Sequence, residues 1–202
     1  WNPGGLAGVW AEENSRDSIF DALKRRESFA TSGPRIRPRF FGGWDLPEGL
    51  CDEAQFAQAG YANGVAMGSK LPTQPQGSSS PSFAVSAFAD PGTEAQPGGL
   101  LQRAQIIKGW VDGEGKFHQE VHDIAGTPDN AADVDLQTCE ARGAGASTLC
   151  GVWQDPNFDA DQDAVYYARI VENPSCRWSA RLCLSLPEGE RPDGCTTDQL
   201  PK

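Results

Sequence analysis

The sequence predicts an α+β fold in which a strand–helix unit, residues 1–33, precedes a disulfide-bonded antiparallel β-sandwich, residues 34–202. Signals of a capped helix gather near the N-terminus, and about seven short strands separated by Gly, Pro and Asp turns follow them. A third observation is the set of six cysteines, which lack the paired CxxC spacing of zinc sites and so predict three disulfides.

The N-terminal unit begins with an apolar strand over residues 6–10 and continues into a helix. Asn14 or Ser15 can cap the open N–H groups of this helix. An apolar stripe runs along it at a spacing of three and four residues, and basic residues crowd its last turn, where the helix dipole favours cations. The stripe consists of Ile19, Phe20 and Leu23. A Gly-Pro pair ends the unit, and a returning strand over residues 35–41 completes an order typical of α/β proteins.

In the remainder of the chain the residue pattern predicts strands and no second helix. Residues 42–81 are expected to be mostly irregular, because glycine, proline and polar residues interrupt any periodic pattern. An Asp-Gly turn is expected to join two of the later strands into a hairpin. The last strand is the one richest in β-branched and aromatic residues. The expected strands cover residues 82–88, 100–112, 116–124, 134–138, 149–153 and 164–172.

Charge and hydropathy exclude several classes of partner. The formal net charge is −11 and the pI is about 4.6, so nucleic acid and anionic membranes would be repelled. No apolar run approaches the roughly 20 residues that a membrane-spanning helix requires. Because disulfides persist in oxidising compartments, we expect a periplasmic or secreted protein.

The pairing of the cysteines is open, since six cysteines allow about 15 connectivities. Short loops favour Cys139–Cys150 and Cys176–Cys183, which would leave Cys51–Cys195 as a long-range bridge.

Carboxylates lie where the first strand ends and the helix begins. Glu12, Glu13 and Asn14 are candidate catalytic residues, because the ends of strands in α/β barrels gather catalytic groups, and paired carboxylates serve as acid, base or metal ligand. The alternative is that they complement the helix N-terminus. Arg16 and Arg35 are candidate substrate-binding residues for an anionic group, against the alternative of solvated charges that form ion pairs.

Other polar groups fit ordinary structural roles better. His118 and His122 are four residues apart on a predicted strand, about 13 Å from one another, which favours exposed histidines over a shared metal ion. The acidic segment from Asp155 to residue 163 resembles a set of calcium ligands, yet turn chemistry explains it equally well. Residues 31–33, Thr-Ser-Gly, fit either an oxyanion cradle or a helix-ending turn.

Four sequence blocks resemble a known family. They are NPGGLAGVWAEENSRDSIFDALKRRESFATSGPRI, SFAVSAFADPGT, LQRAQIIKGWVD and VWQDPNFDADQDAVYYARIVENPSCRWS. Together they resemble the C-terminal part of domain of unknown function 3604, found in large bacterial proteins related to the PHP (polymerase and histidinol phosphatase) metallohydrolases. The resemblance implies that residues 1–33 are the terminal strand–helix unit of an incomplete PHP-like α/β barrel, followed by the sandwich.

The same resemblance implies a metal-dependent hydrolase of phosphoesters or related esters, and the cysteines indicate that it is secreted or periplasmic. Its divalent ions (zinc, manganese or iron) would be held mostly by upstream sequence, because the HxH and DxH metal motifs of such proteins are absent here. We therefore expect no metal on this chain, which alone would be inactive, and a partner in a missing N-terminal barrel segment or a cleaved chain. The alternative is a non-catalytic β-sandwich module that binds a protein partner or a glycan.

Overall fold

The structure is a computed structural model and describes residues 4–78, 80–94, 97–192 and 195. The elements follow in chain order: β1 (Leu6–Val9), α1 (Arg16–Lys24), β2 (Ser28–Thr31), β3 (Arg37–Gly43), η1 (Glu48–Asp52), α2 (Phe56–Asn63), β4 (Val65–Ala66), β5 (Ser82–Phe88), β6 (Leu101–Val111), β7 (Phe117–Gly126), β8 (Asp133–Val134), β9 (Ala141–Arg142), β10 (Thr148–Gln154), β11 (Ala164–Glu172), α3 (Trp178–Ser185) and η2 (Glu188–Glu190).

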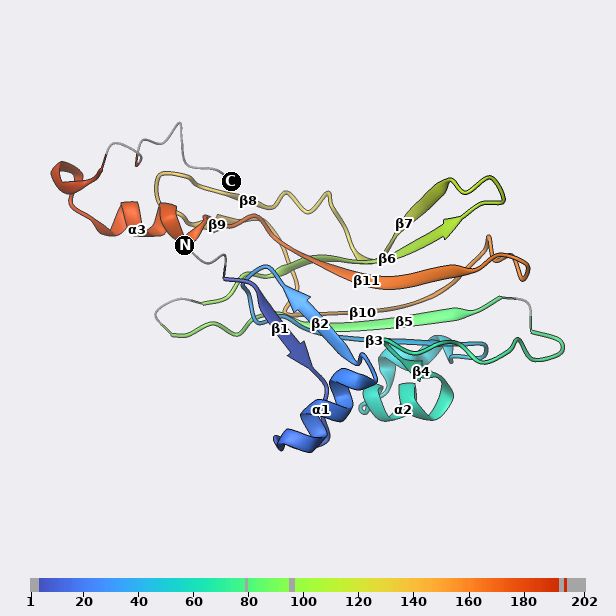
Figure 1. Ribbon diagram of the computed structural model, residues 1–202. Helices are drawn as coiled ribbons and strands as arrows, with labels where there is room; N and C mark the ends of the chain where they lie inside the picture. Colours follow the sequence, from blue (N-terminus) through green and yellow to red (C-terminus); the bar gives the residue numbers. More distant parts are fainter. Residues whose placement is uncertain (1–3, 79, 95–96, 193–194, 196–202) are drawn as a thin grey trace.

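Two antiparallel sheets form the body of the molecule. One has the strand order β10-β5-β3-β4 and the other the order β11-β6-β7. The sheets lie one above the other (Figure 1). Side chains from both fill the space between them, namely Phe40, Phe83, Val85, Ala104 and Ile106. The mixed α+β class and the antiparallel strands expected from the sequence are confirmed.

The N-terminal unit, which we define as β1, α1 and β2, differs from its expectation. β1 pairs antiparallel with β2, from Leu6 opposite Thr31 to Val9 opposite Ser28. The expected returning strand over residues 35–41 instead becomes β3 of the four-stranded sheet. The α/β order was therefore wrong in this respect, because the short β2 had not been recognised and pairs with β1 first.

The helix α1 is capped as its sequence indicates, but it packs differently. Ser15 is the N-cap, and its Oγ accepts a hydrogen bond from the backbone N–H of Ser18 at 3.3 Å. The only fully buried side chain of α1 is Ala22, whereas Phe20 and Leu23 of the expected stripe are 63% and 52% exposed. The helix therefore contacts the rest of the chain through a small residue and leaves large apolar groups in solvent.

Two further helices correct the expectation of a single one. The region expected to be irregular contains η1 and α2, and α3 follows the last strand. α2 packs on β3 through Gly60, where a Cβ atom would lie 2.5 Å from the ring of Phe41. A close helix–strand approach of this kind depends on tertiary contact, so the local sequence does not reveal it.

All three predicted disulfide pairings are wrong, although three disulfides form as expected. The bridges are Cys51–Cys150, Cys139–Cys176 and Cys183–Cys195. Short loops did not decide the pairing, because packing brings η1 against β10 and brings Cys139 into a small cluster with Cys176 and Ala180. Among the described residues, no helix has both the length and the apolar character needed to cross a membrane.

Candidate functional site

The predicted catalytic residues lie at the start of α1 and are exposed. The backbone N–H groups of Glu12 and Glu13 donate to the Oγ of Ser18 at 3.2 and 3.3 Å, which fixes the turn that enters the helix. Asn14 precedes the N-cap. None of the three cavities found among the described residues is lined by Glu12, Glu13 or Asn14.

The two predicted substrate-binding arginines are on separate elements. Arg16 is the first residue of α1 and is exposed. Arg35 lies before β3, where its backbone N–H donates to Oδ2 of Asp90 at 2.7 Å. The cavities described here are lined by neither of them.

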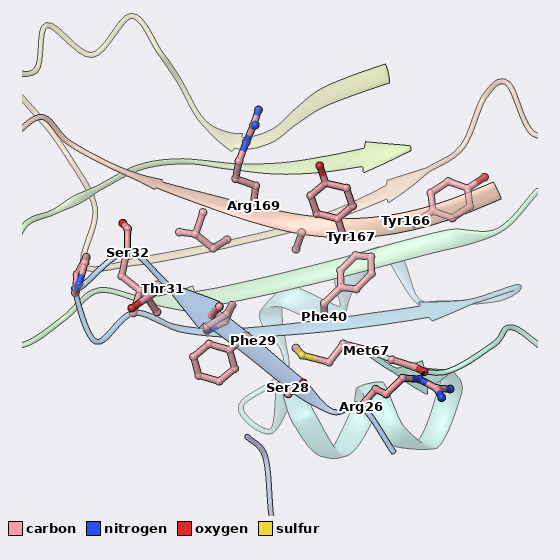
Figure 2. A pocket seen from close by; sticks show the side chains of 17 residues that line it. Arg26, Ser28, Phe29, Thr31, Ser32, Phe40, Met67, Tyr166, Tyr167 and Arg169 are labelled. Atoms are coloured by element: carbon pink, nitrogen blue, oxygen red, sulfur yellow. Dashed lines mark hydrogen bonds between the residues drawn. The ribbon is translucent and has the colours of Figure 1, made fainter. Parts of the chain in front are cut away.

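The best-defined concave region runs along one flank of the sandwich. Its first cavity, about 620 Å³, lies between β2 on one side and β11 on the other, with β3 as its floor (Figure 2). Residues 28–32 and 166–170 form the two walls, and Phe40 and Met67 contribute to the apolar floor. Cavities of roughly 300–1,000 Å³ with such a lining are typical of binding sites.

A second cavity continues the first along the same flank. Its volume is about 940 Å³, and the two cavities share Phe40, Met67, Gly68 and Tyr166 in their linings. Beyond this shared part the walls come from the loop after β4 and from the start of β11. We call the combined depression the flank groove.

A buried carboxylate fastens the N-terminal unit to the sandwich beside this groove. Glu27 is 5% exposed, and its Oε1 accepts hydrogen bonds from Tyr61 and from Arg39, the latter at 3.3 Å. Its Oε2 lies 3.5 Å from Arg25. The guanidinium of Arg39 lies 3.5 Å above the ring of Trp10. Burial, and then the hydrogen bond to Glu27, raise the pKa of Tyr61, so its hydroxyl remains a donor.

A second buried charge pair holds the wall of the groove at Tyr166. Asp155 is fully buried, lies 2.7 Å from the Nζ of Lys108 and accepts a hydrogen bond from the hydroxyl of Tyr166 at 2.6 Å. Burial alone would raise the pKa of Asp155, but hydrogen bonds from Lys108, Tyr166 and the backbone of Asn157 outweigh it and lower the pKa. Burial and the contact with Asp155 raise the pKa of Tyr166. Asp155 is thus a structural group, and it is not available as a calcium ligand.

No group of three or more His, Cys, Asp or Glu side chains within the described ranges is arranged to hold a metal ion. His118 and His122 were expected to be exposed and are half-buried instead. Their rings stack on Trp110 and Trp153, at 5.4 and 4.5 Å between ring centroids.

The sequence did not predict the flank groove, although it indicated a possible anion site at two of its residues. Thr31 and Ser32, considered as an oxyanion cradle, form part of one wall, and the Oγ1 of Thr31 accepts from the backbone N–H of Gly33 at 3.2 Å. Arg26 and Arg169 were not recognised as a pair. They are 143 positions apart, and only the fold brings them to one cavity.

Comparison with known proteins gives one match. The family model described as "Protein of unknown function (DUF3604)" matches residues 1–199. No curated protein and no solved structure matches the chain.

Proposed function

Since the chain belongs to the DUF3604 family, we propose that it is the supporting C-terminal module of a secreted PHP-like hydrolase of phosphoesters or related esters. In this proposal a catalytic barrel, supplied by sequence outside this chain, holds the divalent ions and carries out the hydrolysis. The N-terminal unit presents the surface on which that barrel packs.

The observation that carries the proposal is the exposed apolar face of α1. Phe20 and Leu23 are three residues apart, so they lie on the same side of the helix, and both are more than half exposed. Leu6 of the adjacent β1 is 43% exposed. Burying an apolar side chain of this size contributes roughly 1.5–3 kcal/mol, which is a substantial driving force for docking. Three disulfides are consistent with the extracellular location that the proposal requires.

The first test is the intact mass and metal content of the protein isolated from its natural source. We expect a chain or complex well above 21.6 kDa that contains a divalent metal and hydrolyses p-nitrophenyl phosphate until a chelator is added. A metal-free, inactive native protein of 21.6 kDa would overturn the proposal.

The second test places polar residues on the docking surface of that native protein. The double variant Phe20→Ser/Leu23→Ser should lower the rate of p-nitrophenyl phosphate hydrolysis. It should also weaken the contact between the barrel and the N-terminal unit. The matched control, Phe117→Ser/Val121→Ser, changes two other exposed apolar side chains, which are 61% and 44% exposed on β7, and should leave hydrolysis unchanged. Equal effects of the two pairs would contradict the assignment of the docking surface to α1.

A second candidate function is a non-catalytic module that binds a protein partner or a glycan. The observation that favours it is the flank groove, whose two connected cavities have volumes of about 620 and 940 Å³. This function does not depend on the hydrolase and can coexist with it.

A further inference from the structure

The flank groove lies beside one strand edge that has no partner strand among the described residues, that of β11. β11 pairs with β6 over residues 164–172, and no strand within the described residues pairs with its other edge. The first half of β3 on the opposite sheet is not such an edge, because the carbonyl of Pro38 accepts from Nε1 of Trp10 at 2.9 Å and the carbonyl of Phe40 accepts from the backbone N–H of Met67 at 2.9 Å. An unpaired edge presents a row of N–H and C=O groups that can accept another chain.

The edge of β11 carries little of the protection usual for exposed strands. Natural edge strands are commonly short or interrupted by proline or lysine. β11 is nine residues long, AVYYARIVE, and contains neither of these residues. Its register is regular up to a shift between Val171 and Glu172. A long, regular edge of this composition is suited to pairing.

The first cavity follows this edge. Successive side chains of a strand point to opposite faces, so a cavity beside one face would contact alternate residues. Here five consecutive residues of β11, 166–170, and five of β2, 28–32, line the cavity. Figure 2 shows β11 and β2 on opposite sides of the space, with Phe40 and Met67 between them. The space therefore borders the backbone of β11, where a hydrogen-bonded strand would lie.

The charged residues that line the first cavity favour an acidic ligand. The lining contains Arg26 and Arg169 but no Asp or Glu, in a chain that has 28 acidic and 17 basic residues. Arg26 is held through its Nε by the carbonyl of Gly68 at 2.9 Å, and Arg169 through its Nε by Gln105 at 2.7 Å. Figure 2 shows Arg169 on the face of β11 away from Phe40 and Met67, where every second side chain of an added strand would also point. Among the described contacts, none occupies the terminal nitrogens of either guanidinium, so an acidic side chain on that outer face of the added strand can pair with Arg169.

From these features we infer that the flank groove binds an extended peptide that adds as a strand to the free edge of β11. The backbone of the peptide bonds to β11, its alternate apolar side chains lie on the floor at Phe40 and Met67, and an acidic residue pairs with Arg26 or Arg169. This inference deepens the second candidate function, on which it rests, and is independent of the hydrolase proposal.

The test uses the whole chain and two synthetic peptides, acetyl-EVTVTV-amide and its basic counterpart acetyl-KVTVTV-amide. Titration calorimetry should show binding of the acidic peptide at least about tenfold tighter than that of the basic one. Hydrogen exchange followed by NMR should show added protection of backbone amides within residues 166–170 when the acidic peptide is present.

Two matched variants then locate the site. Ala30 and Ala7 are directly opposite on β2 and β1 and both are exposed, but only Ala30 lines the cavity. Ala30→Glu should raise the Kd of the acidic peptide at least about tenfold, and Ala7→Glu should leave that Kd unchanged. Arg26→Gln should reduce the preference for the acidic peptide, whereas Lys24→Gln, an exposed basic residue of α1 outside the cavity, should not.

Several results would overturn the inference. They are the absence of binding at millimolar peptide, equal loss of affinity in the two alanine variants, or binding without protection of β11. None of these results bears on the mass, metal content or hydrolytic activity that test the hydrolase proposal, so the two proposals fail separately.

Discussion

The large apolar side chains between the two sheets are buried, whereas those on the surface of α1 are mostly exposed. Ile106 and Val85 are fully buried between the two sheets, whereas Phe20 and Leu23 of α1 are mostly in solvent. The space between the sheets is filled by apolar packing, whereas polar contacts join the N-terminal unit to the sandwich, among them those of Glu27 with Arg39 and Tyr61 and the hydrogen bond from Nε1 of Trp10 to the carbonyl of Pro38 at 2.9 Å. Large apolar side chains on the surface of α1 are what our docking proposal requires.

The largest effect is expected from breaking the buried pair of the sandwich. Asp155→Asn leaves Lys108 buried without its counter-charge, and such losses cost about 3–5 kcal/mol of the free energy of unfolding. Urea denaturation at pH 7 measures it. A cost below about 1 kcal/mol would show that Lys108 finds other partners.

The same carboxylate predicts a dependence on pH. The pKa of Asp155 is lower when folded than its unfolded value of about 3.9, so its stabilisation is present above that value and is lost as the pH falls through the folded pKa. Wild-type stability should therefore decline below about pH 4 more steeply than that of Asp155→Asn. Asp90 and Asp112, whose pKa values are also lowered, provide the slope that remains in the variant.

The next largest effect comes from the apolar core. Ile106→Ala removes a buried side chain between the sheets and should cost about 2–5 kcal/mol in urea denaturation. Leu23→Ala, an exposed position on α1, should change stability by less than about 0.5 kcal/mol. Comparable costs for the two variants would contradict the distinction between the regions.

A smaller, local effect is expected at the polar attachment. Glu27→Gln removes the charge that Arg25 and Arg39 share and should cost about 1–3 kcal/mol. Hydrogen exchange should show the loss in the N-terminal unit before the sandwich opens. Tyr61→Phe, which removes one donor and keeps the charge, should cost less than Glu27→Gln.

The smallest effect on stability is expected from Phe20→Ser/Leu23→Ser. Unfolding should change by less than about 0.5 kcal/mol for each exposed site, while binding of an apolar fluorescent dye to the isolated chain should fall. A large loss of stability would mean that this face of α1 is internal to the chain.

The sequence predicted the strands whose own residues carry a strand pattern. β5 and β11 were expected over residues 82–88 and 164–172 and have those bounds, because alternating or β-branched residues mark each of them. β2, α2 and α3 were missed, since each is short and depends on contacts made elsewhere. β2 exists through its pairing with β1, and α2 through the fit of Gly60 against Phe41.

The flank groove was beyond sequence reasoning for a related reason. Its walls combine β2 with β11, about 140 residues away, and neither pattern indicates that their edges face each other. Glu12, Glu13 and Asn14 lie just before α1, as expected. Arg35, expected to begin a strand, lies two residues before β3 instead. Their proposed catalytic and binding roles stay predictions.

The disulfides affect how the protein resists proteolysis. The spans 51–150 and 139–176 overlap, so a single cut at any bond between Cys51 and Cys176 leaves two pieces that are still covalently joined. The third bridge, Cys183–Cys195, closes a separate short span. The N-terminal unit precedes the first bridged cysteine, so no disulfide would hold it to the rest of the protein after a cut. One cut between β2 and β3, within residues 32–36, would break its covalent link, and that of the face we assign to the barrel, to the rest of the chain.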